Sequence, residues 1–217
     1  MKSKLLKPVQ WLLRGLVLIL FRPRKTYVSE KARQEAFSEP CVIISNHVRG
    51  FDGAVIFTLL PGKRITGLVA QDMLENSKPL RWLCACLPVM RIDREHASLS
   101  WLRDSRRLLK EGQSIYLCPE GRCNFNRGMR PFKPGFALLA ASAGVKVVPV
   151  FHNGEYYPLF GKRFRMLIGE PFTVAPPPEG LSAEVLAMEA GEAFDSMREL
   201  ERRLNGAVRL MEGSGEK

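Results

Sequence analysis

The sequence lacks several features that define common classes of protein. Residues 1–25 contain seven lysines and arginines but no aspartate or glutamate. The longest apolar stretch, residues 9–21, is interrupted by Arg14 and is shorter than the about 20 apolar residues that span a bilayer. No internal repeat and no low-complexity tract is present, which excludes solenoids and biased disordered chains.

A cysteine framework is also absent. The count of five is odd, and no small-residue cleavage site follows the N-terminal apolar stretch, so a secreted disulfide scaffold is excluded. Cys84-x-Cys86 and Cys118-x4-Cys123 do not form two matched ligand turns, and we expect no metal site. These cysteines are interpreted as reduced thiols that are buried or incidental.

Positive charge dominates what is present. Lys+Arg 33 against Asp+Glu 22 gives a net charge of +11, and 46% of residues are hydrophobic, enough for a folded core in one domain. Such a basic chain suits an anionic partner, either a lipid surface or a nucleic acid. Aromatic residues are 9% and are not interleaved with basic ones as a platform for stacked bases, so no nucleic-acid partner is expected.

Three regions follow from the charge and the apolar pattern. Residues 1–25 are expected to form a basic amphipathic helix that lies in a membrane interface, with Trp11 and Leu12 among the residues entering the acyl boundary. A helix packed on the core is the alternative interpretation. Residues 26–178 form an α/β core, and residues 179–217 form an amphipathic helix packed on that core.

Short β-branched runs alternate with helical patterns in the core. Strands are expected at residues 41–45, 65–70, 89–92, 114–118, 145–151 and 165–168. Helices are expected at residues 54–60, 80–87, 98–110 and 135–143, with Asp52 and Ser98 as caps and Pro61-Gly62 as a stop. This alternation predicts an α/β fold with a mixed central sheet covered by helices.

His47 and Asp52 lie directly after the first of these strands. Residues five apart on one helix diverge by about 140°, so a continuous helix would separate them. A strand, a tight turn at Gly50 and a helix starting at Asp52 would instead bring the carboxylate to the imidazole. That contact would fix the ring tautomer and make His47 a general base. A capping aspartate beside a turn histidine is an equally simple interpretation of these residues alone.

Two further clusters follow expected strands. Glu120 and Gly121 stand at the sheet edge where α/β proteins place ligands, and Arg122 can pair with a phosphate. Arg91-Ile92-Asp93-Arg94 alternates polar and apolar residues and can present two guanidinium groups on one face. The alternative for the first cluster is a turn at a strand end with solvated charges. The alternative for the second is a surface network of arginine and aspartate. The other two histidines, His96 and His152, are expected to be surface or packing residues.

Taken together, these clusters resemble the glycerolipid acyltransferase family, which includes the lysophosphatidic acid acyltransferases. Asn46-His47 and Asp52 look like its N-H-x4-D block, and Arg94 ends the counterpart of its second block. Pro119-Glu120-Gly121 looks like the third block, Lys133 lies in the counterpart of an F-K-x-G segment, and Pro149 lies in the fourth. The resemblance runs from residue 38 to residue 172. This sequence departs from the family in the third block. Where the family usually has E-G-T-R-S, Gly121 is followed by Arg122-Cys123-Asn124, so that Cys123 holds the arginine position.

The resemblance implies an O-acyltransferase that uses acyl-CoA or acyl-carrier protein as co-substrate and needs no other cofactor, metal or covalent enzyme intermediate. His47 would remove the hydroxyl proton of a lysophospholipid-like acceptor, and Asp52 would orient His47. The implied substrate-binding residues are Asn46, Arg94, Glu120, Gly121, Arg122, Lys133 and Pro149. The expected location is the cytoplasmic face of an anionic membrane, with peripheral or monotopic attachment. The alternatives are a thioester or lipid hydrolase with the same His/Asp pair, and a non-catalytic protein that binds anionic lipid or nucleic acid.

Overall fold

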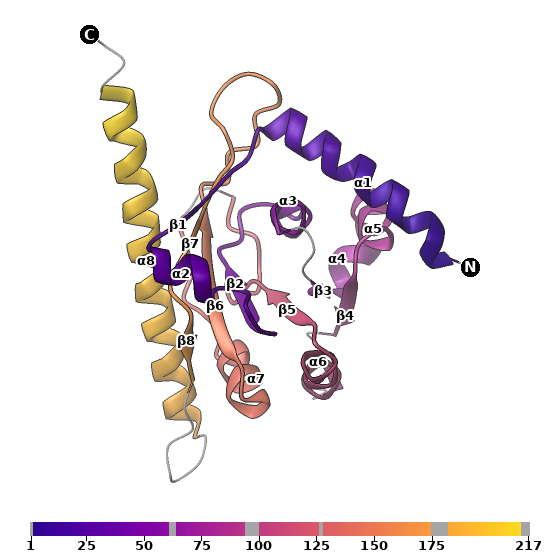
Figure 1. Cartoon of the computed structure of the whole chain (residues 1–217). Coiled ribbons are helices and arrows are strands. Elements are labelled where there is room, and N and C mark those ends of the chain that lie inside the picture. The colour runs from indigo at the N-terminus through magenta and orange to yellow at the C-terminus, as the bar shows by residue number, and fades with distance from the viewer. Residues whose placement is uncertain (1, 61–63, 94–99, 126–127, 175–181, 214–217) are drawn as a thin grey trace.

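The computed structural model describes residues 2–60, 64–93, 100–125, 128–174 and 182–213 (Figure 1). Its helices are α1 (Lys2–Phe21), α2 (Glu30–Glu35), α3 (Asp52–Leu59), α4 (Gln71–Glu75), α5 (Lys78–Ala85), α6 (Ser100–Lys110), α7 (Gly135–Ala143) and α8 (Ala183–Gly213). Its strands are β1 (Arg24–Tyr27), β2 (Val42–Ser45), β3 (Ile65–Ala70), β4 (Val89–Ile92), β5 (Ser114–Leu117), β6 (Lys146–His152), β7 (Arg165–Ile168) and β8 (Phe172–Thr173).

The strands form one mixed sheet. Their order is β1-β7-β6-β2-β5-β3-β4, with β8 paired to β6 outside this path. The five strands from β6 to β4 are parallel to one another, whereas β7 and β8 are antiparallel to β6. Because β6, β2 and β5 are adjacent and parallel, the segments that follow them meet at one edge of the sheet.

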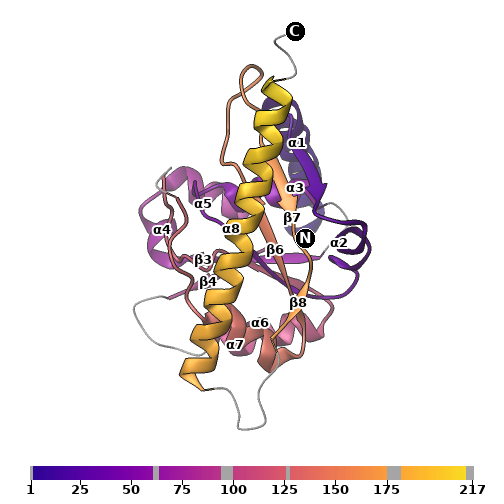
Figure 2. The same ribbon diagram turned by 90° about the vertical axis from the view of Figure 1, so that its left-hand side faces the viewer.

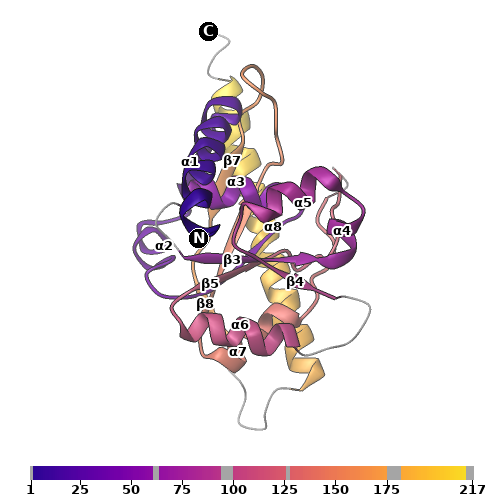
Figure 3. The ribbon, with the colours of Figure 1, turned by 90° about the vertical axis from the view of Figure 1, so that its right-hand side faces the viewer.

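Both faces of the sheet are buried under helices. Val42 and Ile44 of β2 pack in one apolar layer with residues of α6, α7 and α8. Ile43 packs in the opposite layer with residues of α3 and with Ala36 and Phe37, which follow α2. This alternation is the two-residue period of a strand that is covered on both sides. Helices lie on opposite sides of the sheet in Figure 3, and α8 runs along β6 and β7 in Figure 2.

The predicted sheet with flanking helices is confirmed, and the six expected strands and four core helices are present within one to two residues. The helix of residues 52–59 differs in its start: Phe51 is the N-cap and Asp52 is its first residue. Pro61-Gly62 and Ser98 lie outside the described residues. Strand β1 was not expected, and the proposed boundary after residue 25 falls inside it.

Helix α1 contacts α3 and leaves much of its surface exposed (Figure 1). Trp11, Leu12 and Ile19 are among its most exposed apolar side chains. Its end is joined to the loop after β6, because the N–H of Leu159 donates to the carbonyl oxygen of Leu20 at 2.8 Å. Across the residues that the structure describes, no helix has the length and apolar content to cross a membrane.

Candidate active site

The candidate site lies at the edge where β2, β5 and β6 end. His47 follows β2 by two residues, Glu120 follows β5 by three, and His152 is the last residue of β6. Three segments that are distant in the sequence therefore meet at this edge, as the parallel strand order requires.

The predicted contact between His47 and Asp52 is present. Nδ1 of His47 lies 3.0 Å from Oδ2 of Asp52, whose side chain is fully buried. The same oxygen accepts the backbone N–H groups of Val48 and Arg49 at 2.7 and 2.8 Å. The carboxylate therefore binds the turn that precedes its own helix, and this turn brings the imidazole back to it.

Tyr156, which the sequence pattern did not reveal, completes the surroundings of Asp52. Its hydroxyl group donates a hydrogen bond to Oδ1 of Asp52, and its ring packs edge-on against Phe51 with centroids 4.6 Å apart. Burial raises the pKa of Tyr156 well above its ordinary value, so the phenol keeps its proton and remains a donor. Because Tyr156 is 104 residues beyond Asp52, only the fold brings the two together.

The charges of the pair follow from these contacts. Burial would raise the pKa of Asp52, but the nearby His152 ring and the hydrogen bonds with His47, Tyr156 and the Arg49 N–H together outweigh burial and lower it. Burial would lower the pKa of His47, but the neighbouring sulfur of Cys118 and the hydrogen bonds with Asp52 and Cys123 together outweigh burial and raise it above its ordinary value. Asp52 is therefore ionised, and it stabilises the protonated form of His47.

His152 is a packing residue, as expected. Its ring is fully buried and stacks on Phe164 with centroids 5.3 Å apart. Burial lowers its pKa, so the ring is neutral, and Nε2 lies 3.0 Å from the carbonyl oxygen of Asn46. His152 thus fixes the backbone beside His47, whereas His96 lies outside the described residues.

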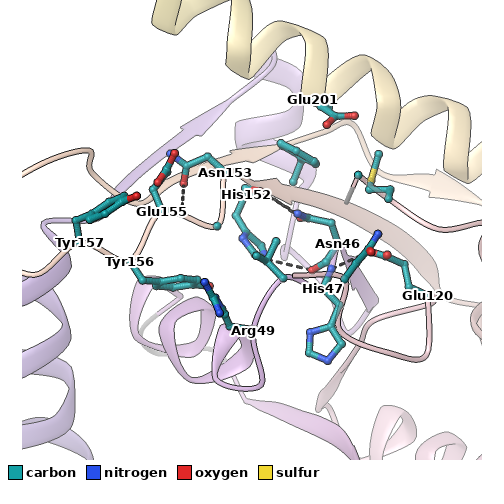
Figure 4. Close-up of a pocket in the computed structure, with 16 residues that line it drawn as sticks. Asn46, His47, Arg49, Glu120, His152, Asn153, Glu155, Tyr156, Tyr157 and Glu201 are labelled. Carbon is teal, nitrogen blue, oxygen red and sulfur yellow. Dashed lines mark hydrogen bonds between the residues drawn. The ribbon is translucent and has the colours of Figure 1, made fainter. Parts of the chain in front are cut away.

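Asn46 was predicted to bind substrate, but its side chain is already occupied. Its Nδ2 donates to the carbonyl oxygen of His152, and its Oδ1 accepts the N–H of the same residue, both at 2.9 Å. The amide therefore clamps the end of β2 to the end of β6 (Figure 4). Its geometry supports a positioning role in place of direct recognition.

Glu120 has a comparable role. Its two carboxylate oxygens accept the backbone N–H groups of His47 at 2.8 Å and of Arg130 at 2.9 Å. Burial raises the pKa of Glu120, against the opposing effect of these two N–H groups. Glu120 lines a pocket, and each of its carboxylate oxygens accepts a backbone N–H, so it holds the His47 backbone in place.

Gly121 and Lys133 lie together at the mouth of the site. Gly121 has a φ of +72°, which favours glycine, and a Cβ there would lie 3.3 Å from Cε of Lys133. Lys133 is exposed, and its backbone N–H donates to the carbonyl oxygen of Pro119. These two predicted residues are in place to face a substrate.

Two predicted substrate-binding residues, Pro149 and Arg122, are not brought to the site. Pro149 is buried within β6 and lines neither pocket described below, because it packs against the backbone of Gly169 on the α8 side. Arg122 is exposed and also lines neither pocket. Arg94 lies outside the described residues.

Cys123 corrects a further prediction. It is neither buried nor incidental, because its Sγ lies 3.2 Å from Nε2 of His47 and its side chain is partly exposed. The residue that replaces the expected arginine thus contacts the ring nitrogen opposite Asp52.

Two pockets, each of about 460 Å³, meet at His47. The first is polar, and Figure 4 shows Asn153, Glu155 and Tyr157 at one end and Glu201 of α8 above it. The second is mainly apolar, and its walls come from α3, β3, β4, α6 and α7. Its apolar lining comprises Phe51, Ala54, Phe57, Leu68, Val69, Ala70, Met73, Leu87, Val89, Ile92, Trp101, Leu117 and Phe136.

Comparison with known proteins agrees with this architecture. The crystal structure of the 1-acyl-sn-glycerophosphate acyltransferase PlsC from Thermotoga maritima superposes with a TM-score of 0.59 at 18% identity. The match covers 93% of this chain and 82% of that one, and it shows a shared fold.

Curated relatives share more of the sequence. Human 1-acyl-sn-glycerol-3-phosphate acyltransferase beta is 32% identical over 123 residues, 55% of this chain and 43% of that protein. The human alpha enzyme is 28% identical over 175 residues, 77% of this chain and 61% of that protein. The matches therefore span about half the length of these relatives. The sequence model described as Acyltransferase matches residues 24–153, well over half of the chain, and the chain belongs to this acyltransferase family.

Proposed function

We propose that the chain is an O-acyltransferase that moves a fatty acyl group from acyl-CoA or acyl-carrier protein to the hydroxyl group of a lysophospholipid-like acceptor. One observation carries this proposal. His47, held by the buried carboxylate of Asp52, stands where an apolar pocket and a polar pocket meet. An acyl chain and a polar headgroup need these two environments on either side of a base.

His47 acts on the acceptor hydroxyl group in this proposal. Neutral His47 takes the hydroxyl proton at Nε2 while Asp52 stabilises the imidazolium that forms. The acceptor oxygen attacks the carbonyl carbon of an acyl thioester and forms a tetrahedral oxyanion. Collapse breaks the carbon–sulfur bond, and the departing thiolate takes the proton from His47.

The apolar pocket is assigned to the acyl chain. Transfer of each methylene from water to an apolar environment is worth about 0.8 kcal/mol, so a chain of fatty-acid length gains binding energy there. His47, Gly121 and Lys133 line the same pocket, which supports a bound chain whose carboxyl end reaches the base.

The polar pocket is assigned to the acceptor. Arg49 lines it as an exposed cation, and it lies over the ring of Phe125 at 5.7 Å. A phosphate or a polar lipid headgroup can pair with this guanidinium group. Glu155 and Glu201 also line this pocket, and their charges disfavour a second anionic group there.

We also propose attachment to the cytoplasmic face of an anionic membrane through α1. Trp11 is 68% exposed, and Phe160, in the loop joined to the end of α1, is 84% exposed. The absence of acidic residues before residue 26 favours contact with anionic headgroups. These side chains form a lipid-facing surface made of α1 and residues 157–160.

Thiol release from acyl-CoA, with and without a panel of lysolipids, tests the function. We expect release to depend on a lysolipid, to be abolished in His47→Ala, and to be unchanged in Gln34→Ala on the exposed side of α2. Vesicle binding by His47→Ala should remain. Equal release without any lysolipid would assign a hydrolase instead, and full turnover in His47→Ala would remove the proposed base.

A further inference from the structure

Charged side chains of both signs line the polar pocket beside His47. Among the described residues that line it, Arg49 is the one arginine or lysine, and it is exposed. Three lining residues are acidic, namely Glu120, Glu155 and Glu201. Because the chain as a whole has a net charge of +11, this excess of carboxylates is a local property of the pocket. It favours a ligand that carries a positive charge.

The three carboxylates differ in what they bind. Glu120 accepts two backbone N–H groups, and a carboxylate oxygen of Glu201 lies 3.9 Å from Nε of Arg198. Glu155 is partly buried, and its backbone N–H donates to Oδ1 of Asn153. Its carboxylate makes no hydrogen bond or ion pair with the rest of the described chain. A partly buried carboxylate of this kind is stabilised when a cation pairs with it.

The wall of the same pocket contains an unpaired hydrogen-bond acceptor. His152 lines the pocket and is fully buried, and its Nε2 lies 3.0 Å from the carbonyl oxygen of Asn46. Because the ring is neutral and Nε2 donates to this carbonyl group, Nδ1 carries no proton and is an acceptor. No N–H or O–H group of the described residues donates to Nδ1. A headgroup that brings a hydrogen-bond donor therefore suits this wall better than a second anionic oxygen.

We propose that the acceptor has a zwitterionic head, in which an anionic group pairs with Arg49 and a protonated amine pairs with Glu155. This inference rests on the proposed acyltransferase function and deepens it by naming the acceptor class. In the view of Figure 4, the side chain of Arg49 lies between the ring of His47 and Glu155. A lysophosphatidylethanolamine carries a hydroxyl group, a phosphodiester and a primary amine in the corresponding order.

The number of cations near His47 agrees with a singly charged anionic group. The phosphate monoester of lysophosphatidate carries a charge of about −1.5 to −2 at pH 7, whereas a phosphodiester carries a single negative charge. Arg49 supplies one positive charge to the polar pocket, and Lys133 lines the apolar pocket instead. Cys123, which holds the arginine position of the third block, lies 3.2 Å from Nε2 of His47 and adds no positive charge there.

Competition between two acceptors in one neutral detergent micelle tests the proposal. Lysophosphatidylethanolamine and lysophosphatidylglycerol share a phosphodiester and an acyl chain, and they differ in the amine. With palmitoyl-CoA or palmitoyl-acyl-carrier protein as donor, the ratio of the two products, measured by mass spectrometry, gives the ratio of the kcat/KM values. This ratio does not depend on how much of a variant is folded. We expect the wild type to favour the amine-bearing acceptor by at least about 10-fold, which corresponds to about 1.4 kcal/mol.

Variants assign the preference to the two charges. Glu155→Gln should bring the product ratio to within about threefold of unity, and Glu155→Lys should invert it. Arg49→Ala should slow transfer to both acceptors and leave the ratio unchanged. Glu39→Gln, at an exposed carboxylate after α2 that lines neither pocket, is the control and should keep the wild-type ratio.

Two kinds of failure can be told apart. A wild type that favours lysophosphatidylglycerol, or a wild-type ratio in Glu155→Gln, would overturn the zwitterionic acceptor and leave the proposed acyl transfer standing. No product from these two acceptors or from lysophosphatidate, with either donor, would contradict the proposed function itself.

Discussion

At the scale of single residues, the site depends on the hydrogen bonds that converge on Asp52. One buried carboxylate accepts from His47, from Tyr156 and from two backbone N–H groups. Removing one of these donors leaves the buried carboxylate with fewer hydrogen bonds. The resulting loss of stability is larger than the net contribution of an average hydrogen bond, because the group is charged and buried.

Tyr156→Phe is the sharpest test of this network, because it removes the hydroxyl group and keeps the ring packing on Phe51 and Phe164. A hydrogen bond to a charged group contributes about 1.5–3 kcal/mol, and we expect the free energy of unfolding to fall by about that amount. Urea denaturation followed by circular dichroism measures it. Tyr27→Phe, outside the site, serves as the control and should have the same free energy of unfolding as the wild type. Equal stability of Tyr156→Phe and wild type would show that the contact with Asp52 contributes nothing.

The pKa of His47 gives a prediction on pH dependence. Because its pKa is raised, the ring stays protonated above its ordinary range and loses its proton only at higher pH. A base must be neutral, so kcat/KM should rise with pH, with a midpoint above the ordinary histidine value of about 6.5.

Asp52→Asn supplies the comparison, since it removes the charge that favours imidazolium. Its rate should be lower, and the rising limb of kcat/KM should move toward acid pH. A limb at the same pH in both proteins would mean that His47 is not the titrating group.

The contacts between individual side chains of the site were the hardest feature to predict from the sequence. His47 and Asp52 could be found because they lie five positions apart in a recognisable block. Tyr156 could not, since it reaches Asp52 from a distant loop and belongs to no block. Cys123 lies in the third block as a departure from it, and only the fold brings it to His47. Asn46 and Glu120 were found, but their partners are backbone groups of His152, His47 and Arg130, which no residue pattern reveals.

At the scale of elements, the buried strands were the predictable part. β2, β3 and β6 are rich in β-branched residues because they are covered on both faces. β1 has the sequence Arg-Lys-Thr-Tyr, which is polar and exposed, and only its pairing with β7 makes it a strand. Edge strands of this kind carry little local signal.

The wall of the apolar pocket gives a prediction at this scale. Gly67 of β3 faces Phe57 of α3, and a Cβ there would lie 2.9 Å from Cζ of the ring. Gly67→Ala should push Phe57 into the pocket and shift donor preference toward shorter acyl chains by several-fold. Rates with acyl-CoA donors of increasing length measure this shift. Gly191→Ala on α8, where a Cβ has open space, is the control. If the dependence of the rate on acyl-chain length is the same in Gly67→Ala and wild type, the acyl chain does not bind in this pocket.

At the scale of the whole molecule, the lipid-facing surface lies apart from α8. In Figure 1, α1 and the loop after β6 lie near one another, while α8 runs on the other side of the sheet. Arg14 lies over the exposed ring of Trp11 on this proposed surface, so one docking orientation would bring a cation and an aromatic side chain to the membrane together.

Phe160→Ser tests the docking surface. Burying a phenylalanine side chain is worth about 1.5–3 kcal/mol, so partitioning onto anionic vesicles should weaken by roughly 10- to 100-fold. Co-sedimentation with vesicles containing phosphatidylserine measures it. Met188→Ser, at another exposed apolar position, on α8, should bind as wild type does. An equal loss of vesicle binding in both variants would mean that the membrane contact is not specific to the surface that contains Phe160.

The central claim is that His47 is the base of an acyl transfer. Mass-spectrometric measurement of the acylated lysolipid formed from palmitoyl-CoA, at saturating substrates, tests it most directly. General-base catalysis contributes about 10²- to 10⁴-fold, so His47→Gln should form product at least about 100-fold more slowly than wild type while keeping its fold. Product formation by His47→Gln at the wild-type rate would contradict the account.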